Sequence, residues 1–231
     1  REKLELIAAC GIDRVLLLRF NQDLAMMPAE QFVERILVGQ LGIRHLYVGD
    51  DFRFGKERSG DFAQLQRMGD VHGFATESLA TVGDDCGRIS STRIRESLAV
   101  GDLQTAACCL GHDYRITGRV VHGHKRGRTI GFPTMNVGMA RLHSPVRGVF
   151  AVRVDGLEAE SVFGVANVGN RPTLDGDDRF VLEVHLFDFD RDVYGRRVTV
   201  RFIERIRDER KFESFDALRE QILLDAAQAR E

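Results

Sequence analysis

The stretch FVLEVHLF, residues 180–187, decides the fold of the second half of the chain. In an extended strand, successive side chains point to opposite faces. Its apolar residues would share one face and its polar residues the other, with Leu182, Val184 and Leu186 opposite Glu183 and His185. The alternation predicts a β-strand that is buried on one side and carries a carboxylate on the other.

Four further stretches of the second half have the same strand-like rhythm. They are separated by Gly, Pro, Asp and Asn, the residues that favour turns. Repeated short strands of this kind predict an antiparallel sheet or a small closed barrel. The stretches are YRITGRVV (114–121), GVFAVRVDG (148–156), SVFGVANVG (161–169) and RRVTVRFIERI (196–206).

A helix-like pattern follows the last strand, at about 214–229. Ser214 is the expected N-cap, since a serine hydroxyl accepts a hydrogen bond from a backbone N–H of the first helical turn. The apolar residues recur at helical spacing and predict one buried face, formed by Phe215, Leu218, Ile222, Leu223 and Ala226.

Residues 1–113 instead alternate helix-like and strand-like stretches. This order is typical of crossover units, in which helices cover a parallel sheet. We place the boundary between the two modules, 1–113 and 114–231, near Asp113. The helix-like stretches are EKLELIAAC (2–10), PAEQFVERILVGQL (28–41) and GDFAQLQRMGD (60–70), and the strand-like ones are RVLLLRF (14–20) and RHLYVGD (44–50).

The composition is that of an ordinary soluble globular protein, with 29% charged residues and a net charge of −2. It gives no general argument for binding to nucleic acid or to an anionic membrane. No apolar run approaches the roughly 20 residues that span a bilayer. The cysteines show neither zinc-site nor C-x-x-C spacing, so we expect buried thiols at Cys108 and Cys109 and a reducing, cytoplasmic setting.

The loop GHKRGRTIGFPTMN, residues 123–136, concentrates groups that suit phosphate. Its glycines, Gly123, Gly127 and Gly131, allow backbone amides to approach phosphate oxygens, and Lys125, Arg126 and Arg128 add positive charge. Thr134 and Asn136 lie two apart, so in an extended segment they share a face and could offer oxygen ligands to Mg²⁺. On these grounds alone, a solvated basic turn beside a structural Pro-Thr is an equally good interpretation.

The same loop resembles the signature of bacterial riboflavin kinases, G-x-V, G, G-R, G-F-P-T-x-N. The similarity continues, in the family's order, through RGVFAV, GVANVGNRPT, LEVHLFDFDRDVYGRRVTVRF and IRDERKF, and covers essentially all of residues 114–231. The resemblance implies a six-stranded antiparallel barrel with a C-terminal helix. It also implies transfer of the γ-phosphoryl group of ATP to the riboflavin 5′-hydroxyl, which gives FMN.

The resemblance assigns roles within this module. Thr134 and Asn136 would contact Mg²⁺ and the ATP phosphates, with Gly123, Lys125 and Gly127 in the same phosphate-binding loop. Glu183, on a neighbouring strand, would accept the proton of the alcohol. Without the resemblance, Glu183 is a polar-face strand residue. Arg128 is not assigned by the resemblance: its charge would suit neutralisation of the transferring group, and a surface arginine is an equally good interpretation. Three further residues would form a turn near the flavin or a purely structural turn: Asn167, Asn170 and Thr173.

In the first half, ISSTRIRESL (89–98) places small hydroxyl residues just before a helix, where they act as N-caps and where free amides bind anions. A plain helix cap is the alternative. This stretch and YVGDDFRFGKERSGD (47–61) resemble the FMN adenylyltransferase module of bifunctional bacterial riboflavin kinase/FAD synthetases. By that resemblance ATP phosphates would be held by Ser90, Ser91, Thr92 and Arg95. Near the nucleotide or flavin would lie Asp51, Phe52 and Phe54, the last two otherwise being core aromatics.

That module is Rossmann-like, and the family's first strand and H-x-G-H phosphate loop have no counterpart in this sequence, which begins at Arg1. We therefore expect an incomplete nucleotidyltransferase-like module with impaired adenylyl transfer, while the full-length protein would convert FMN to FAD.

The sequence leaves two alternatives to a flavin-modifying enzyme. A non-catalytic flavin or nucleotide carrier could use the same barrel, and a nucleic-acid-binding barrel could use the three basic loop residues. The sequence has no stretch in which basic and aromatic residues are interspersed, as would be expected of a barrel that binds nucleic acid. The expected partners are the small molecules riboflavin, FMN and ATP, without nucleic acid or membrane.

Overall fold

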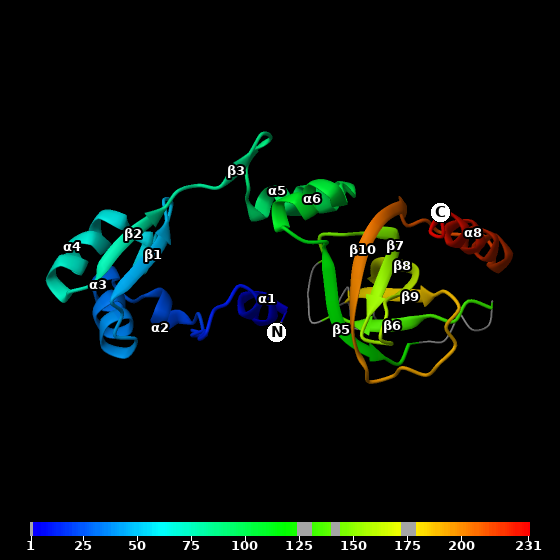
Figure 1. The fold of residues 1–231 in the computed structure, drawn as a ribbon, viewed down its shortest axis with the longest axis horizontal. Coiled ribbons are helices and arrows are strands. Elements are labelled where there is room, and N and C mark those ends of the chain that lie inside the picture. Colours follow the sequence, from blue (N-terminus) through cyan, green and yellow to red (C-terminus); the bar gives the residue numbers. More distant parts are fainter. Residues whose placement is uncertain (1, 124–130, 140–143, 172–178) are drawn as a thin grey trace. The chain divides into compact units, whose positions relative to one another are not determined.

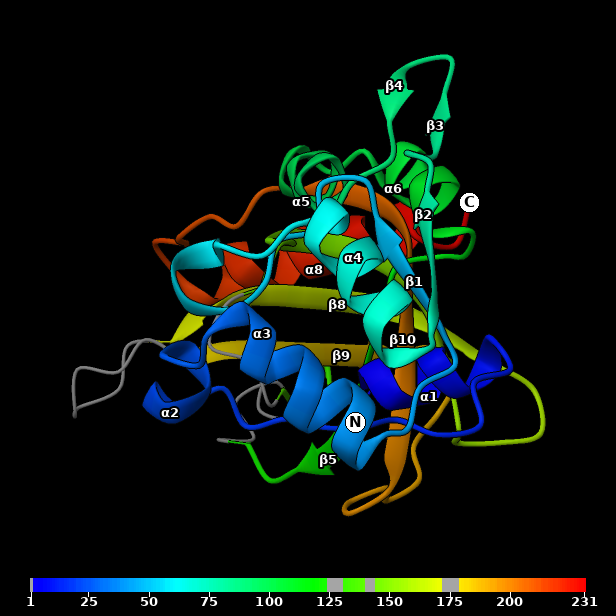
Figure 2. The same cartoon turned by 90° about the vertical axis from the view of Figure 1, so that its left-hand side faces the viewer.

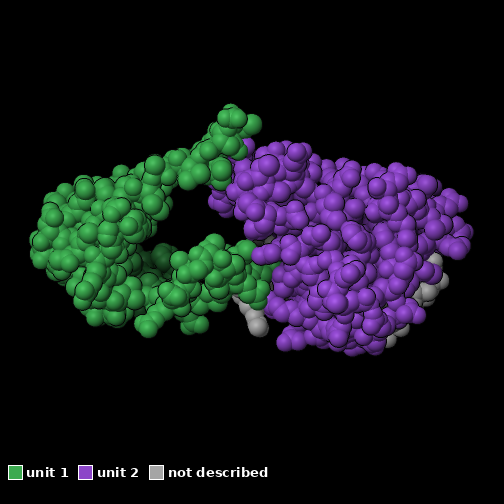
Figure 3. Space-filling model, in the orientation of Figure 1, with its two compact units in different colours: residues 1–89 green, residues 90–231 purple. Residues whose placement is uncertain are grey.

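The structure is a computed structural model that describes residues 2–123, 131–139, 144–171 and 179–231. The chain divides into two compact units, Arg1–Ile89 and Ser90–Glu231, coloured separately in Figure 3. This division falls earlier in the chain than the boundary predicted near Asp113, for a reason found in the second unit.

The first unit contains a β-strand, a helix and a second, parallel strand in succession, as the alternating rhythm predicts. Strands β1 and β2 pair in parallel from His45↔Ala75 to Gly49↔Leu79, and helix α4 lies against them (Figures 1 and 2). The elements of this unit are α1 (Glu2–Ala9), α2 (Gln22–Ala25), α3 (Ala29–Gln31), the π-helix η1 (Phe32–Gln40), β1 (His45–Gly49), the 3₁₀-helix η2 (Lys56–Arg58), α4 (Phe62–His72), β2 (Ala75–Leu79), β3 (Gly83–Asp84) and β4 (Gly87–Arg88).

The predicted strand RVLLLRF is wrong for this structure. Residues 12–20 form neither helix nor strand, and their apolar side chains face outward, with Leu17 73% and Phe20 80% exposed. A continuous apolar run is expected in a parallel strand because both of its faces are covered. Among the described residues the sheet holds only β1 and β2, so this run has no strand beside it.

The second unit contains a closed barrel whose six strands are all antiparallel, in the order β10-β5-β6-β9-β8-β7 (Figure 1). The barrel with its C-terminal helix confirms the predicted architecture. Its elements are α5 (Ser91–Val100), α6 (Leu103–Leu110), β5 (Arg115–Val121), β6 (Met135–Gly138), β7 (Gly148–Asp155), β8 (Val162–Arg171), β9 (Arg179–Leu186), β10 (Arg197–Arg207) and α8 (Phe215–Gln228).

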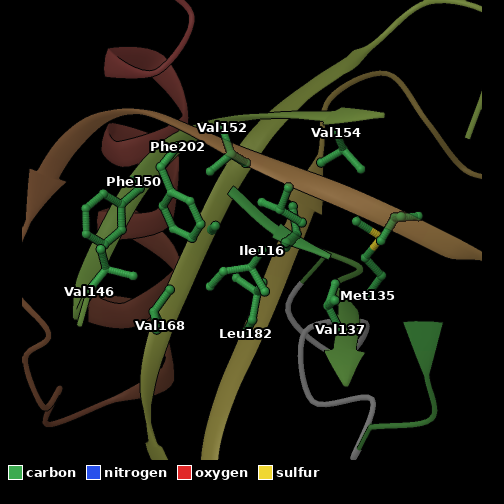
Figure 4. Close-up of a cluster of buried hydrophobic side chains, with 14 of the residues drawn as sticks. Ile116, Met135, Val137, Val146, Phe150, Val152, Val154, Val168, Leu182 and Phe202 are labelled. Carbon is green, nitrogen blue, oxygen red and sulfur yellow. The ribbon is translucent and has the colours of Figure 1, made fainter. Parts of the chain in front are cut away.

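The apolar face of β9 points into the barrel, as its alternation predicts. Leu182 and Val184 are fully buried among side chains of the other strands, and the rings of Phe150 and Phe202 meet edge to face at 5.2 Å (Figure 4). The odd-numbered positions of β9 therefore face outward, and with them Glu183 and His185.

Helices α5 and α6 belong to the barrel unit because they complete its core. Their residues Leu98, Leu103 and Ala106 are buried in the same cluster as the barrel interior. Arg205 of β10 also donates a hydrogen bond to the carbonyl of Val100, at the end of α5 (3.1 Å). These contacts explain why the units divide before Ser90.

Helix α8 is capped by Ser214, whose Oγ accepts a hydrogen bond from the Ala217 N–H (3.1 Å), as predicted. Its predicted buried face is right only in part: Leu218, Ile222 and Ala226 are partly buried, but Phe215 is 68% and Leu223 53% exposed. The helix lies on the outer surface of the barrel, where Ala226 and the residue that caps the helix, Ala229, pack against Val149, Val165 and Phe187.

The four cysteines are free, and Cys108 is exposed, so the expectation that it is buried is wrong. The residue lies on the side of α6 away from the barrel core, which takes up Leu103 and Ala106 instead. No helix within the described ranges combines the length and apolar character needed to cross a membrane.

Candidate active site

Three polar residues stand side by side on the outer surface of the barrel. In the strand register, Glu183 of β9 lies opposite Asn136 of β6 on one side and opposite Asn167 of β8 on the other. Directly opposed residues of antiparallel strands project from the same face, with Cβ atoms about 5 Å apart. The register therefore brings together Asn136 and Glu183, two residues that the sequence assigns to one site.

Asn136 is almost buried, with 9% of its surface exposed, although it faces out of the barrel. The backbone of Gly123 passes directly over its amide, because a Cβ atom added at Gly123 would lie 2.1 Å from the Asn136 Nδ2. A larger residue there would force either the Asn136 amide or the backbone of residue 123 to shift. The end of β5 and the start of the phosphate-binding loop are thus in contact with the Asn136 side chain.

The oxygen atoms at this point suit Mg²⁺ bound mainly by a substrate. Thr134 offers a hydroxyl and Asn136 an amide oxygen, and both are neutral. Within the described ranges no group of three His, Cys, Asp or Glu side chains could hold a metal ion. Magnesium usually takes few ligands from protein and the rest from phosphates and water. The residues present therefore fit the ion in the form of its complex with a nucleotide.

His185 connects β9 to the turn that precedes Thr134. Its Nδ1 lies 2.9 Å from the carbonyl oxygen of Pro133, and its ring meets that of Phe132 edge on, with centroids 5.2 Å apart. The sequence placed this histidine on the polar face of its strand and gave it no role. A side chain that binds a backbone carbonyl leaves no signature in a single sequence.

A second carboxylate approaches the site from the segment after β10. The amide of Asn167 donates a hydrogen bond to Glu209 Oε1 (3.3 Å), and Glu209 also covers Gly169, where an added Cβ would collide with the carboxylate. The sequence interpretation did not single out Glu209. Asn167 and Asn170 lie within strand β8, which corrects the expectation of a turn at these residues.

A cavity of about 470 Å³ lies at one end of the barrel, and Thr134 and Pro133 form part of its wall. Asn136, Glu183 and Asn167 do not line it. Inward-facing side chains of the barrel supply its apolar part, and the segment after β9 adds aromatic and charged residues; the lining includes Val120, Met135, Val184, Leu186, Phe189, Asp190, Arg191, Asp192 and Tyr194. This size and mixed lining suit a flat organic ring that carries polar groups.

The structure does not describe the rest of the phosphate-binding loop. The predicted residues Lys125, Gly127 and Arg128 lie outside the described residues, as do Arg126 and Thr173. Their assigned roles stay predictions.

The candidate residues of the first half fall into two places. Ser90 is the N-cap of α5, and its Oγ accepts a hydrogen bond from the Arg93 N–H (3.2 Å). Ser91, Thr92 and Arg95 follow it in the first turns of that helix. In the first unit, Asp51 accepts a hydrogen bond from Arg88 (2.9 Å), while Phe54 is 7% exposed in the core and stacks against Phe52.

Comparisons with protein families agree on both halves of the chain. The family model described as riboflavin kinase matches residues 110–231. The family model described as FAD synthetase matches residues 1–93. Neither match includes 94–109, a stretch that contains most of α5 and α6.

Curated relatives are similar over the whole chain. A bifunctional riboflavin kinase/FMN adenylyltransferase of Escherichia coli (strain K12) is 49% identical over 231 residues, which is 100% of this chain and 74% of the relative. The protein of the same description from Pseudomonas fluorescens is 50% identical over 220 residues, or 95% and 70% of the two chains.

A solved structure described as a macrolide-efflux protein from Streptococcus pneumoniae is similar in fold. Its TM-score is 0.83 at 32% identity, and the match covers 100% of this chain and 74% of that one. Efflux is said of that protein alone. Both family models and the curated relatives agree on flavin chemistry for this sequence.

Proposed function

The chain belongs to the family of bifunctional riboflavin kinase/FMN adenylyltransferases, and from this premise we propose how its barrel transfers phosphate. The family's two reactions are the phosphorylation of riboflavin by ATP, which gives FMN, and the adenylylation of FMN, which gives FAD. The riboflavin kinase match coincides with the barrel, so the first reaction belongs to this unit.

Glu183 accepts the proton of the riboflavin 5′-hydroxyl. In this step the hydroxyl oxygen forms a bond to the γ-phosphorus of ATP, the bond from that phosphorus to the bridging oxygen breaks, and ADP leaves. The hydroxyl proton passes to a carboxylate oxygen of Glu183. The observation that carries this proposal is the position of Glu183 between Asn136 and Asn167 on one face.

Thr134 and Asn136 hold the phosphates of ATP together with Mg²⁺. A magnesium ion bound there supplies neutralisation of the negative charge on the phosphate oxygens. Asn136 is suited to this task because its side chain is almost buried and the backbone of Gly123 lies close to its amide.

The two substrates then approach Glu183 from opposite sides. The cavity that Thr134 helps to line receives the adenine ring, because Thr134 also holds the phosphates. Asn167 and Glu209 lie on the far side of Glu183, and their amide and carboxylate suit the hydroxyl and imide groups of the flavin. This order places the 5′-hydroxyl and the γ-phosphate next to each other at Glu183.

The substitution Glu183→Gln tests the proposal. The amide keeps the size of the side chain but cannot take the proton, so we expect FMN formation to fall about 100-fold or more. The affinity for riboflavin, measured by the quenching of flavin fluorescence, should stay within about twofold of that of the parent.

Glu204→Gln is the matched control, because Glu204 is an exposed carboxylate on another strand, β10. It should leave both measurements unchanged. FMN formation by Glu183→Gln at the parental rate would remove Glu183 from the reaction. A parent chain that binds flavin but forms no FMN would favour the non-catalytic carrier.

A further inference from the structure

The motif T-x-N (134–136), at β6, lies beside the motif E-x-H (183–185), on the neighbouring strand β9. The register of β6 and β9 pairs Asn136 with Glu183 and Met135 with Val184. Continued by one residue, it sets Thr134 opposite His185. Each member of the proposed phosphate-binding pair therefore has a partner on β9, a carboxylate in one case and an imidazole in the other.

Thr134 lies just outside the paired part of β6, which begins at Met135. Strand pairing therefore does not by itself hold its backbone. The preceding residue, Pro133, has no N–H to contribute, and only its carbonyl can form a hydrogen bond. That carbonyl is the group His185 contacts, with 2.9 Å between Nδ1 and the oxygen.

The imidazole of His185 is itself held in place by two aromatic rings. Phe132 meets it edge on at 5.2 Å and 77°, and Phe187 at 6.0 Å and 76°. Phe187 is 8% exposed and belongs to the small apolar cluster under α8. The histidine thus links the turn before Thr134 to a packed apolar cluster on the barrel surface.

We propose that His185 is a positioning residue for phosphoryl transfer, which fixes Thr134 by donating a hydrogen bond from Nδ1–H to the Pro133 carbonyl. A carbonyl oxygen only accepts, so Nδ1 must carry the proton, and Nε2 plays no part in the contact. The inference rests on the proposed role of Thr134 in binding ATP. His185 touches backbone and not substrate, so its effect reaches the reaction only through Thr134.

Two substitutions separate the hydrogen bond from the packing of the ring. His185→Phe keeps a flat ring between Phe132 and Phe187 but has no donor. His185→Asn loses the ring but places an amide N–H close to the position of Nδ1. We expect His185→Phe to raise the KM for ATP about tenfold, the effect of one lost hydrogen bond. The KM for riboflavin should stay within about twofold, and His185→Asn should restore the KM for ATP to within about threefold of the parent.

The split between the two KM values and the rescue by asparagine distinguish positioning from a general loss of structure. The inference is overturned if folded His185→Phe keeps the parental KM for ATP, or if His185→Asn is as impaired as His185→Phe. Thermal unfolding establishes that each variant is folded. If phenylalanine at this position prevents folding, His185→Leu takes its place as the variant without a donor, and the same comparison with His185→Asn applies.

Thr134→Ala tests the premise separately. If this variant binds ATP as the parent does, the proposed role of Thr134 fails, whatever His185 does. If Thr134→Ala raises the KM for ATP and His185→Phe does not, the proposed function stands and the positioning role of His185 alone is wrong.

Discussion

At the scale of single residues, the site depends on the side chain of Asn136 and on the absence of a side chain at Gly123 beside it. Asn136 is one of two buried polar or charged residues in the described part of the chain. Its amide is covered by the backbone of Gly123, in the segment that follows β5. Alternation predicted that Thr134 and Asn136 share one face and that Glu183 faces away from the core, whereas only the resemblance to riboflavin kinases assigned the three residues to one site. The sequence could not predict a role for Glu209, because its pattern does not distinguish this residue from the charged residues beside it.

The substitution Gly123→Ala should disturb the site although it replaces none of the side chains proposed to bind ATP. The new Cβ would lie 2.1 Å from the Asn136 amide, so either that amide or the backbone of residue 123 must move. We expect the KM for ATP to rise about tenfold or more, since a small misplacement of a binding group is costly. Gly138→Ala is the control, because its Cβ would meet Val121 at a tolerable 3.3 Å. Equal KM values for ATP in the two variants would contradict the contact.

At the scale of secondary-structure elements, α8 is attached to the barrel by a buried ion pair. Asp225 is 2% exposed, and Arg207 of β10 donates hydrogen bonds to both of its carboxylate oxygens, at 2.7 to 3.1 Å. Gln221 donates to it as well (2.7 Å). The sequence predicted the helix, its cap and part of its buried face, including Ala226, but not the burial of Asp225. An aspartate in a helix is expected to face solvent unless the position of its partner is known.

The substitution Asp225→Asn should destabilise the barrel unit. It leaves Arg207 with its charge but without a counter-charge, and breaking a buried pair in this way costs about 3 kcal/mol. Asp188→Asn is a matched control, because the pair of Asp188 with Arg230 is exposed and is worth about 0–1 kcal/mol. Urea unfolding of the two variants and the parent gives the comparison. A loss of stability in Asp225→Asn no larger than that in Asp188→Asn would show that α8 does not depend on this ion pair.

At the scale of the whole molecule, the sequence and the structure place the module boundary differently, and both have a physical basis. The rhythm of the sequence changes near Asp113, just before β5. The compact units divide at Ser90, because α5 and α6 bury Leu98, Leu103 and Ala106 in the core of the barrel unit. Periodicity shows that a helix has an apolar face, but the residues that cover this face are distant in sequence. The extent of the folding unit therefore could not be predicted from the pattern alone.

A comparison of two fragments tests which boundary defines the folding unit. Residues 90–231 contain the complete core, whereas 114–231 lack α5 and α6 and expose the apolar surface against which Leu98, Leu103 and Ala106 pack. We expect 90–231 to unfold cooperatively with the midpoint that the barrel shows in the whole chain, and 114–231 to unfold at a markedly lower temperature or to aggregate. If 114–231 does not express, Leu98→Ala in the whole chain measures the same contact, with an expected loss of about 2–4 kcal/mol. Equal midpoints for the two fragments, or no loss in Leu98→Ala, would place the boundary back at Asp113.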